Sequence, residues 1–212
     1  LTLTNRQKAI LIKWIQSGAE YRPHWAFITP ELPEIPSPKI QNWSNQPIDL
    51  FIGRQLFEHG FEPSPPATKE LILRRLSLDV TGLPPSLEEL DAFLADSSEN
   101  AYEKQVDRLL SSAHYGEQMA LYWMDLARFA DTHGYTVDRF RDMSPWRDWV
   151  IKAYNQNMPY DQFITEQLAG DQLPNATKNQ KLATAFNRIH PQNMEGGIVQ
   201  EEFRVEYVAD RT

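Results

Sequence analysis

The chain has 212 residues, a formal net charge of −8 and no cysteine. A negative balance argues against a nucleic-acid-binding surface, which needs a basic face. The absence of cysteine excludes disulfides, cysteine-ligated zinc and covalent attachment of a c-type haem, which uses the motif C-x-x-C-H. No apolar run approaches the ~20 residues of a membrane-spanning helix. A hydrophobic content of 41% suffices for the core of one large domain.

The first predicted element is an amphipathic helix near the N-terminus. Thr4 and Gln7 have the spacing of a capping box, in which each side chain bonds the other residue's backbone N–H. Apolar residues at helical spacing then lead to Gly18: Ile10, Leu11, Trp14 and Ile15. The stretch from Pro23 to Pro47 holds six of the fifteen prolines, which predicts an extended linker or a strap lying on the surface.

From residue 47 onward, one helical pattern follows another. Gly82 with Pro84 and Pro85 gives the clearest stop signal, because glycine permits the helix end and proline prevents continuation. Ser86 and Thr177 each begin a further capping box. Ser144, followed by Pro145, is the predicted N-cap of another helix. The periodicity predicts helices over 48–59, 71–78, 87–94, 102–110, 117–130, 144–154, 159–169, a segment after 177, and 199–210.

No stretch alternates for long enough to indicate a strand. We therefore predict an all-α protein, an irregular bundle of roughly nine helices that follows a long proline-rich N-terminal strap. The predicted organisation is a terminal helix in residues 1–20, a linker in 21–46 and a helical domain in 47–212. Because the chain starts at Leu1 and has no visible signal peptide, we expect a processed or truncated chain.

Several short motifs follow one another through the predicted domain. They are LRRLSLDVTGLPP at 73–85, YEKQVDRLL at 102–110, HYGE at 114–117, WMDLARFAD at 123–131, WRDWVI at 146–151, PYDQF at 159–163, EQLAGD at 166–171, EGG at 195–197 and EEFR at 201–204. In this order they resemble the planctomycete cytochrome-associated domain, a family of unknown function found in large exported bacterial proteins. The resemblance covers roughly residues 47–212.

The resemblance also implies a setting for the chain. Residues 1–20 are similar to the last helix of the small c-type cytochrome domain that precedes this one in the family, and residues 24–27 to the segment joining the two. The family implies haem c in the full-length protein, attached outside this chain, with flanking c-type cytochrome domains as partners. It also implies export, to the periplasm, the cell envelope or the extracellular space.

A haem nearby would need a second axial ligand, commonly histidine or methionine. The candidates are His24, in the family-like junction, and then Met194 and His190. Each of these is equally compatible with an ordinary packing or surface role. The redox partner and the number of haems are left open.

Charged residues accompany the apolar positions of several predicted helices. A buried charge must be paired, and arginine forms bidentate pairs with carboxylates. We therefore expect Arg–carboxylate pairs that tie helices and turns together, drawn from Arg74, Arg75, Asp79, Asp125, Arg128 and Asp131.

Two loops carry candidate catalytic acids. Asp131 and Asp138 flank a segment with His133, where oxygen ligands would suit a hard cation, but the spacing is not that of an EF-hand. We predict no metal site there and a solvated loop. Glu195 and Glu202 lie around Gly196-Gly197, where they either favour the start of the next helix or act as acid or base.

The aromatic residues Tyr122, Trp123, Trp146 and Trp149 predict a core cluster, with a sugar-stacking platform as the alternative for Trp146. The leading functional hypothesis is a helical module of an exported multidomain c-type cytochrome that packs beside haem domains and supports electron transfer. One alternative is an enzyme domain acting on extracellular polysaccharide or another envelope substrate. The other is a structural or adhesive cell-surface module.

Overall fold

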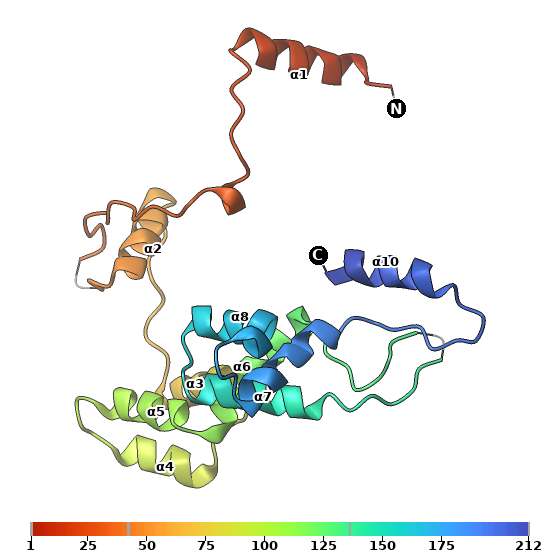
Figure 1. The fold of residues 1–212 in the computed structure, drawn as a ribbon. Helices are drawn as coiled ribbons and strands as arrows, with labels where there is room; N and C mark the ends of the chain where they lie inside the picture. The colour runs from red at the N-terminus through yellow and green to blue at the C-terminus, as the bar shows by residue number, and fades with distance from the viewer. Residues whose placement is uncertain (1, 42, 136, 212) are drawn as a thin grey trace. The chain divides into compact units, whose positions relative to one another are not determined.

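The computed structural model describes residues 2–41, 43–135 and 137–211. In these residues the protein forms ten α-helices and three short 3-10 helices, with no strand beyond an isolated bridge between Thr132 and Phe140. The predicted all-α class is confirmed, and the predicted helix number is close. None of the described helices combines the length and the apolar character that crossing a bilayer requires. The chain divides into two compact units, residues 1–65 and 66–212 (Figure 1).

The N-terminal unit begins with α1 (Asn5–Gln16). The predicted capping box is present: the Gln7 N–H donates to Thr4 Oγ1 at 3.3 Å, and the Thr4 N–H donates to Gln7 Oε1 at 2.9 Å. However, α1 buries no residue. Its predicted apolar face lies exposed, with side chains of Ile10, Leu11, Trp14 and Ile15.

After α1 the N-terminal unit continues as an extended strap, with one 3-10 turn, η1 (Trp25–Phe27), in its described part. Helix α2 (Pro47–Glu58) follows, with proline in its first turn as helix starts favour. Its one buried residue is Gly53, and a Cβ there would lie 3.0 Å from the Trp43 ring. The indole therefore packs directly on the helix backbone.

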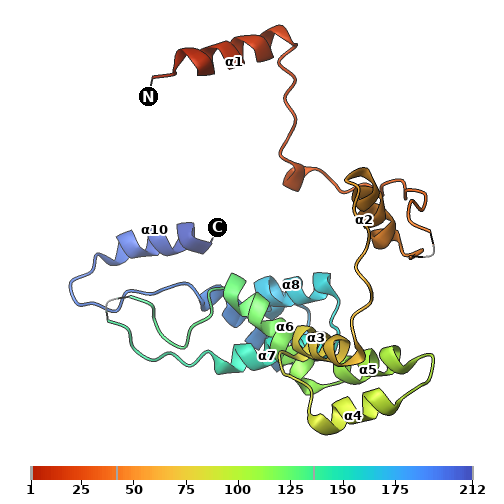
Figure 2. The ribbon, with the colours of Figure 1, turned by 180° about the vertical axis from the view of Figure 1, so that it is seen from behind.

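The C-terminal unit opens with α3 (Lys69–Thr81), α4 (Leu87–Ala95) and α5 (Ala101–Leu110). Leu73, Phe93 and Ala101 form the buried cluster that joins them. Gly82 ends α3 in the left-handed conformation at φ 71°, as its place before two prolines predicts. Helix α3 contacts α4 and α5 and also the later helix α6, so it links the two parts of this unit (Figure 2).

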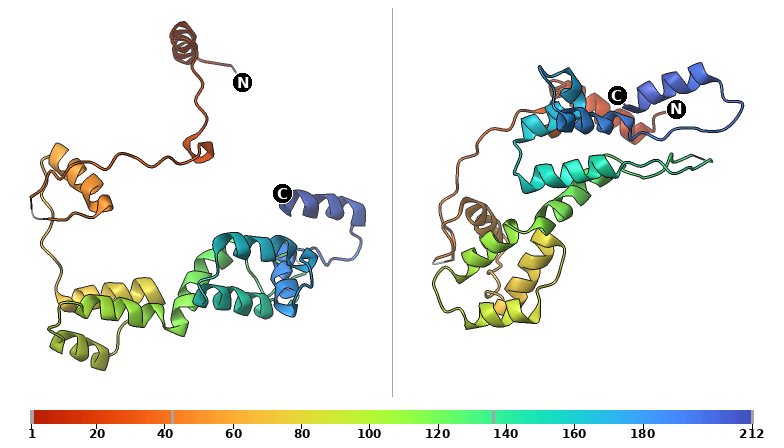
Figure 3. Two further views of the ribbon diagram at one scale, coloured as in Figure 1. Left: turned by 60° about the vertical axis from the view of Figure 1, so that its left-hand side comes forward. Right: turned by 60° about the horizontal axis from the view of Figure 1, so that its bottom comes forward.

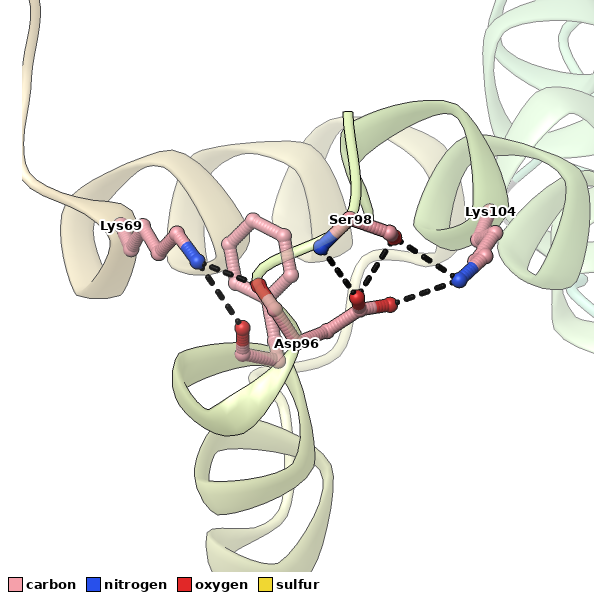
Figure 4. Close-up of polar contacts among 5 residues, drawn as sticks. Lys69, Asp96, Ser98 and Lys104 are labelled. Atoms are coloured by element: carbon pink, nitrogen blue, oxygen red, sulfur yellow. Dashed lines mark hydrogen bonds and ion pairs between the residues drawn. The ribbon is translucent and has the colours of Figure 1, made fainter. Parts of the chain in front are cut away.

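A polar corner fixes the turn between α4 and α5 (Figure 4). Asp96 Oδ1 accepts from the Ser98 N–H at 2.9 Å and the Ser98 hydroxyl at 2.5 Å, and Oδ2 accepts from Lys104 Nζ at 2.9 Å. These contacts, those of Ser98 first, hold the pKa of the Asp96 carboxyl well below its usual range. Lys69 Nζ donates to the Asp96 carbonyl at 2.6 Å, which ties the start of α3 to the same turn.

The larger core lies among α6 (Ala113–Leu126), α7 (Ser144–Asn155), α8 (Tyr160–Ala169) and α9 (Lys178–Ala183), with 3-10 turns η2 (Gly170–Gln172) and η3 (Thr184–Arg188). Its buried side chains include Trp146, Trp149, Val150 and Phe163. Helices α6 and α7 approach closely at Gly116, where a Cβ would lie 2.4 Å from the Ile151 carbonyl oxygen. The Gly116 N–H donates to Asn155 Oδ1 at 2.8 Å, so the crossing is also hydrogen-bonded.

Several local predictions need correction. Trp146 is 1% exposed, so it is a core residue and not a sugar platform, whereas Tyr122 is 66% exposed and lies outside the cluster. The helix predicted over 117–130 spans Ala113–Leu126. Ser144 does not cap α7: Met143 is the N-cap, because the Asp142 carboxylate takes both the hydroxyl and the N–H of Ser144.

Two long connections and the last helix complete the C-terminal unit. Residues 127–135 and 137–143, between α6 and α7, and residues 189–199, after η3, run side by side away from the main helices (Figure 3). The Gln192 N–H donates to the His133 carbonyl at 2.8 Å, which joins the two connections. Helix α10 (Gln200–Arg211) then follows, in the place where the sequence predicts a helix over 199–210.

Candidate functional site

Most of the predicted site residues fall in the paired connections and α10. The sequence places them in two segments far apart, 131–138 and 190–202, and the structure brings these segments together. Arg141 does most of the joining. Its Nη1 donates to the carbonyls of Arg188 at 3.0 Å and His190 at 3.3 Å, and its Nη2 to that of Ile189 at 3.3 Å. Burial lowers the pKa of the Arg141 guanidinium.

Asp131 and Asp138, the two acids of the first segment, stabilise the conformation of their loop. Asp131 Oδ1 accepts the Met143 N–H at 3.0 Å, which closes the loop just before α7. Asp138 Oδ1 accepts the Gly134 N–H at 2.8 Å, and this bond, with a further one from Thr132, lowers the pKa of the Asp138 carboxyl. Both carboxylates are therefore engaged with backbone or hydroxyl donors of their own loop.

The acids of the second segment are exposed. Glu195 lies on the loop before α10, where its N–H donates to Asn193 Oδ1 at 2.9 Å, and Glu202 lies in the first turn of α10. Five well-formed cavities in the described residues are lined by other side chains, and Glu195, Glu202, Asp131 and Asp138 line none of these five. The catalytic role of these acids stays a prediction.

The three candidate haem ligands have different surroundings. His190 is buried, and its ring centroid lies 5.0 Å from that of Tyr207. It lines a cavity of about 140 Å³ together with Arg128 and Asp210. Met194 is 43% exposed on the loop before α10. His190 and Met194 do not share one site in the structure, and their surroundings do not show which of them would ligate a haem. Their role also stays a prediction.

His24 lies in the N-terminal unit and is exposed. Its Nδ1 accepts the Ala26 N–H at 3.2 Å, so the ring caps η1. The Trp25 and Phe27 rings lie with centroids 5.3 Å and 6.2 Å from that of His24. A neutral histidine that accepts at Nδ1 carries its proton on Nε2, so ligation through Nε2 would require this weak cap to break. The bare imidazole edge nevertheless remains open to a partner.

The α10 interface, formed by Arg128, Tyr135 and the facing residues of α10, is the part of the site that the sequence did not reveal. Arg128 makes a bidentate pair with Asp210, at 2.9 and 3.0 Å, and the Tyr135 hydroxyl donates to Glu206 Oε1 at 2.9 Å. Asp210 raises the pKa of Arg128, and the bond to Glu206 raises that of Tyr135. A cavity of about 340 Å³ lies beside these contacts and is lined by Tyr135, Glu206 and Tyr207.

The prediction of arginine–carboxylate pairs is correct for Arg128 alone. Arg74, Arg75 and Asp79 lie exposed on α3, and in the described part of the chain they form no ion pair. Arg128 itself was identified as one of a pair, but its partner lies 82 residues away, and nothing local in the sequence points to it.

The side chains present in this chain limit the ways in which it could hold a cofactor. The sequence contains no cysteine, so it provides no thioether attachment for a haem. The described residues contain no group of three or more histidine, aspartate or glutamate side chains placed to hold a metal ion. The residues predicted as axial donors to a haem are the exposed His24 and Met194 and the buried His190.

These features define an all-α domain that follows an extended N-terminal strap. Comparison with protein families gives the assignment: residues 47–212 match the family described as PSCyt2, protein of unknown function (DUF1549), and the chain belongs to it. The match starts at α2 and covers the whole C-terminal unit. No curated protein and no solved structure matches the chain.

Proposed function

We propose that this chain is a helical module of an exported multidomain c-type cytochrome, where it packs beside haem domains and supports electron transfer. The family's label, PSCyt2, is compatible with a cytochrome association. The observation that carries the proposal is the exposed apolar face of α1, because the residues similar to the end of a small cytochrome domain are those left without a partner in their own unit.

The exposure on α1 is large for a helix of a soluble protein. Ile10 is 58% exposed, Leu11 44%, Trp14 43% and Ile15 61%. Burying one such side chain contributes about 1.5–3 kcal/mol, so leaving four of them in water is unfavourable. The strap behind α1 adds aromatic groups, with Trp25 78% exposed. A contiguous apolar surface of this kind marks an interaction site, and the occupant that we propose is the preceding c-type cytochrome domain.

In this setting the chain's own residues would position the neighbouring haem domain and shield the edge of its haem. His24 is the donor that we propose for contact with a haem edge, since it lies between α1 and α2 with Trp25 and Phe27 against its ring. When bound, the haem supplies one-electron transfer, and its potential depends on axial ligation and burial. The expected location is the periplasm, the cell envelope or the extracellular space.

The decisive experiment is a reduced-minus-oxidised absorption spectrum of the intact protein purified from its native host. The proposal expects the α-band of a c-type haem, and a spectrum without this band would overturn it. If the band is present, His24→Ala should shift it or change the reduction potential. His59→Ala is the matched control, because His59 is an exposed histidine of the same unit, with Nδ1 2.8 Å from the Gln55 carbonyl oxygen.

The role of α1 has its own test in the intact protein. Leu11→Asp places a charge on the apolar face and should increase protease cleavage in residues 19–41, because the strap is released when α1 undocks. Gln16→Asp, on the opposite side of α1, adds the same charge and should leave the cleavage rate unchanged. Equal cleavage of the two variants and the wild type would remove the support that α1 gives to the proposal.

A further inference from the structure

A cavity separate from those beside α10 lies among α7, α8 and the start of α9. Its volume is about 190 Å³, and it is open to solvent on one side. Its polar lining includes Lys152 of α7, Glu166 of α8, and Asn179 and Gln180 of α9, with Gln156 and Thr177 just outside these helices, and Trp149 of α7 also lines it. Sites for drug-sized molecules are larger, about 300–1,000 Å³, so this cavity suits a small metabolite.

Glu166 is the unusual residue of this cavity. Glu166 is only 5% exposed. In the described residues, however, no lysine or arginine lies within ion-pair distance of its carboxylate. Its Oε1 accepts from Gln162 Nε2 at 2.9 Å and from Gln180 Nε2 at 3.1 Å. Its Oε2 accepts no hydrogen bond from any described residue. Burying a carboxylate is unfavourable unless it is paired, so Oε2 is suited to a cationic donor.

Trp149 adds a donor to the same cavity. The residue is 6% exposed, and its indole N–H donates to no described residue, whereas the neighbouring Trp123 donates to Gln167 Oε1 at 2.9 Å. Neither Trp149 Nε1 nor Glu166 Oε2 is among the buried atoms that are fully shielded from solvent and lack a hydrogen-bond partner. Both residues line the cavity. Lys152, at the last turn of α7, adds an ammonium group that forms no ion pair in the described chain.

We propose that this cavity binds a small zwitterion of the α-amino acid class. The ligand's ammonium would donate to Glu166 Oε2, and its carboxylate would accept from Trp149 Nε1 and Lys152 Nζ. A simple cation would be repelled by the charge of Lys152, and a simple anion would be repelled by that of Glu166. A molecule that carries both charges satisfies both residues, and the unused donor and acceptor match its two ends. The proposal does not depend on the cytochrome setting.

The test is isothermal titration calorimetry of the full chain with glycine, L-serine and L-glutamine, with methylamine, acetate and glucose as comparison probes. The expected result is saturable binding of at least one amino acid and none of the comparison probes at the same concentrations. Binding of glucose alone, or no binding of any amino acid, would overturn the proposal. Binding of acetate or methylamine as tight as that of the amino acids would overturn the two-charge arrangement.

Variants locate the site. Glu166→Gln keeps the shape of the side chain and should weaken amino acid binding at least about tenfold, since a charge-assisted hydrogen bond is lost. Lys152→Gln, on an exposed position, should also weaken binding and keeps the test valid if Glu166→Gln unfolds. Asp161→Asn on α8 and Lys181→Gln on α9 are matched controls that do not line the cavity and should bind as wild type. Unchanged affinity in both Glu166→Gln and Lys152→Gln would place the ligand elsewhere.

Discussion

The two units of this protein use similar helices in opposite ways. In the C-terminal unit, α7 buries Trp146, Trp149 and Val150 against neighbouring helices. In the N-terminal unit, α1 has a complete capping box and a helical apolar stripe, but it buries nothing. Local sequence signals therefore suffice to specify a helix, while its stability in a folded protein depends on whether another element covers its apolar face. In the described part of its own unit, α1 has no such cover.

Replacing a tryptophan in each unit tests this contrast most strongly. Trp146→Ala should lower the free energy of unfolding of the C-terminal unit by about 3–5 kcal/mol, because a fully buried indole leaves a cavity. Trp14→Ala on α1, where the indole is 43% exposed, should change it by less than about 0.5 kcal/mol. Urea denaturation followed by far-UV circular dichroism measures both values. Equal losses would show that α1 is part of the same cooperative core.

A pair of glycines tests how tightly the larger core is packed. Gly116→Ala should cost about 1–3 kcal/mol, because the new Cβ would lie 2.4 Å from the Ile151 carbonyl oxygen and the α6–α7 crossing must open. Gly196→Ala has nothing within 4 Å and should leave the unfolding midpoint unchanged or slightly higher. The same denaturation experiment compares the two. A neutral Gly116→Ala would mean that α6 and α7 are separated by more than the structure indicates.

The sequence predicted best what is decided over a few residues. The capping boxes at Thr4, Ser86 and Thr177 are all present, since each needs only residues three apart. The end of α3 at Gly82 is equally local. The cap of α7 was assigned to the wrong residue, because Asp142 competes for the hydroxyl of Ser144, and the motif alone does not show that competition.

Contacts between distant segments were not predictable in the same way. The sequence prediction grouped Tyr122 with Trp123 in a core cluster of aromatic residues, but only the rotation of α6 against its neighbours decides which of the two faces inward. The α10 interface depends on Arg128 meeting Asp210 across 82 residues. Glu166 appeared in the sequence only as the first residue of the EQLAGD motif, with no role assigned to it. An acid on a predicted helix is usually exposed, and the burial of Glu166 is visible only once α8 and α9 are packed.

The α10 interface lies between the two extremes of the molecule, and its loss should have a modest effect. Arg128→Gln removes a bidentate pair whose side chains are 54% and 34% exposed, so the cost should be at most about 1 kcal/mol. Amide hydrogen exchange should accelerate in α10 but not in α7. Arg147→Gln is the control, because its pair with the adjacent Asp148 joins no second element. Faster exchange in α7 would contradict a local role for the pair.

The smallest expected effect is the acid dependence of the α4–α5 corner. The carboxylate of Asp96 accepts three bonds in the folded state, so its pKa lies below the usual value of about 3.9. Above that value the carboxyl is charged in both states and the stabilisation is complete; as the pH falls below it, the unfolded chain takes up the proton first and the stabilisation is lost. Wild type should therefore exceed Asp96→Asn in stability near neutral pH, and the difference should shrink steadily below about pH 4.

Asp91→Asn, on an exposed α4 position without a polar contact in the described residues, should follow the wild-type acid profile in thermal denaturation. A constant difference between wild type and Asp96→Asn at every pH would mean that the corner is held by the shape of the turn and not by the charge of Asp96.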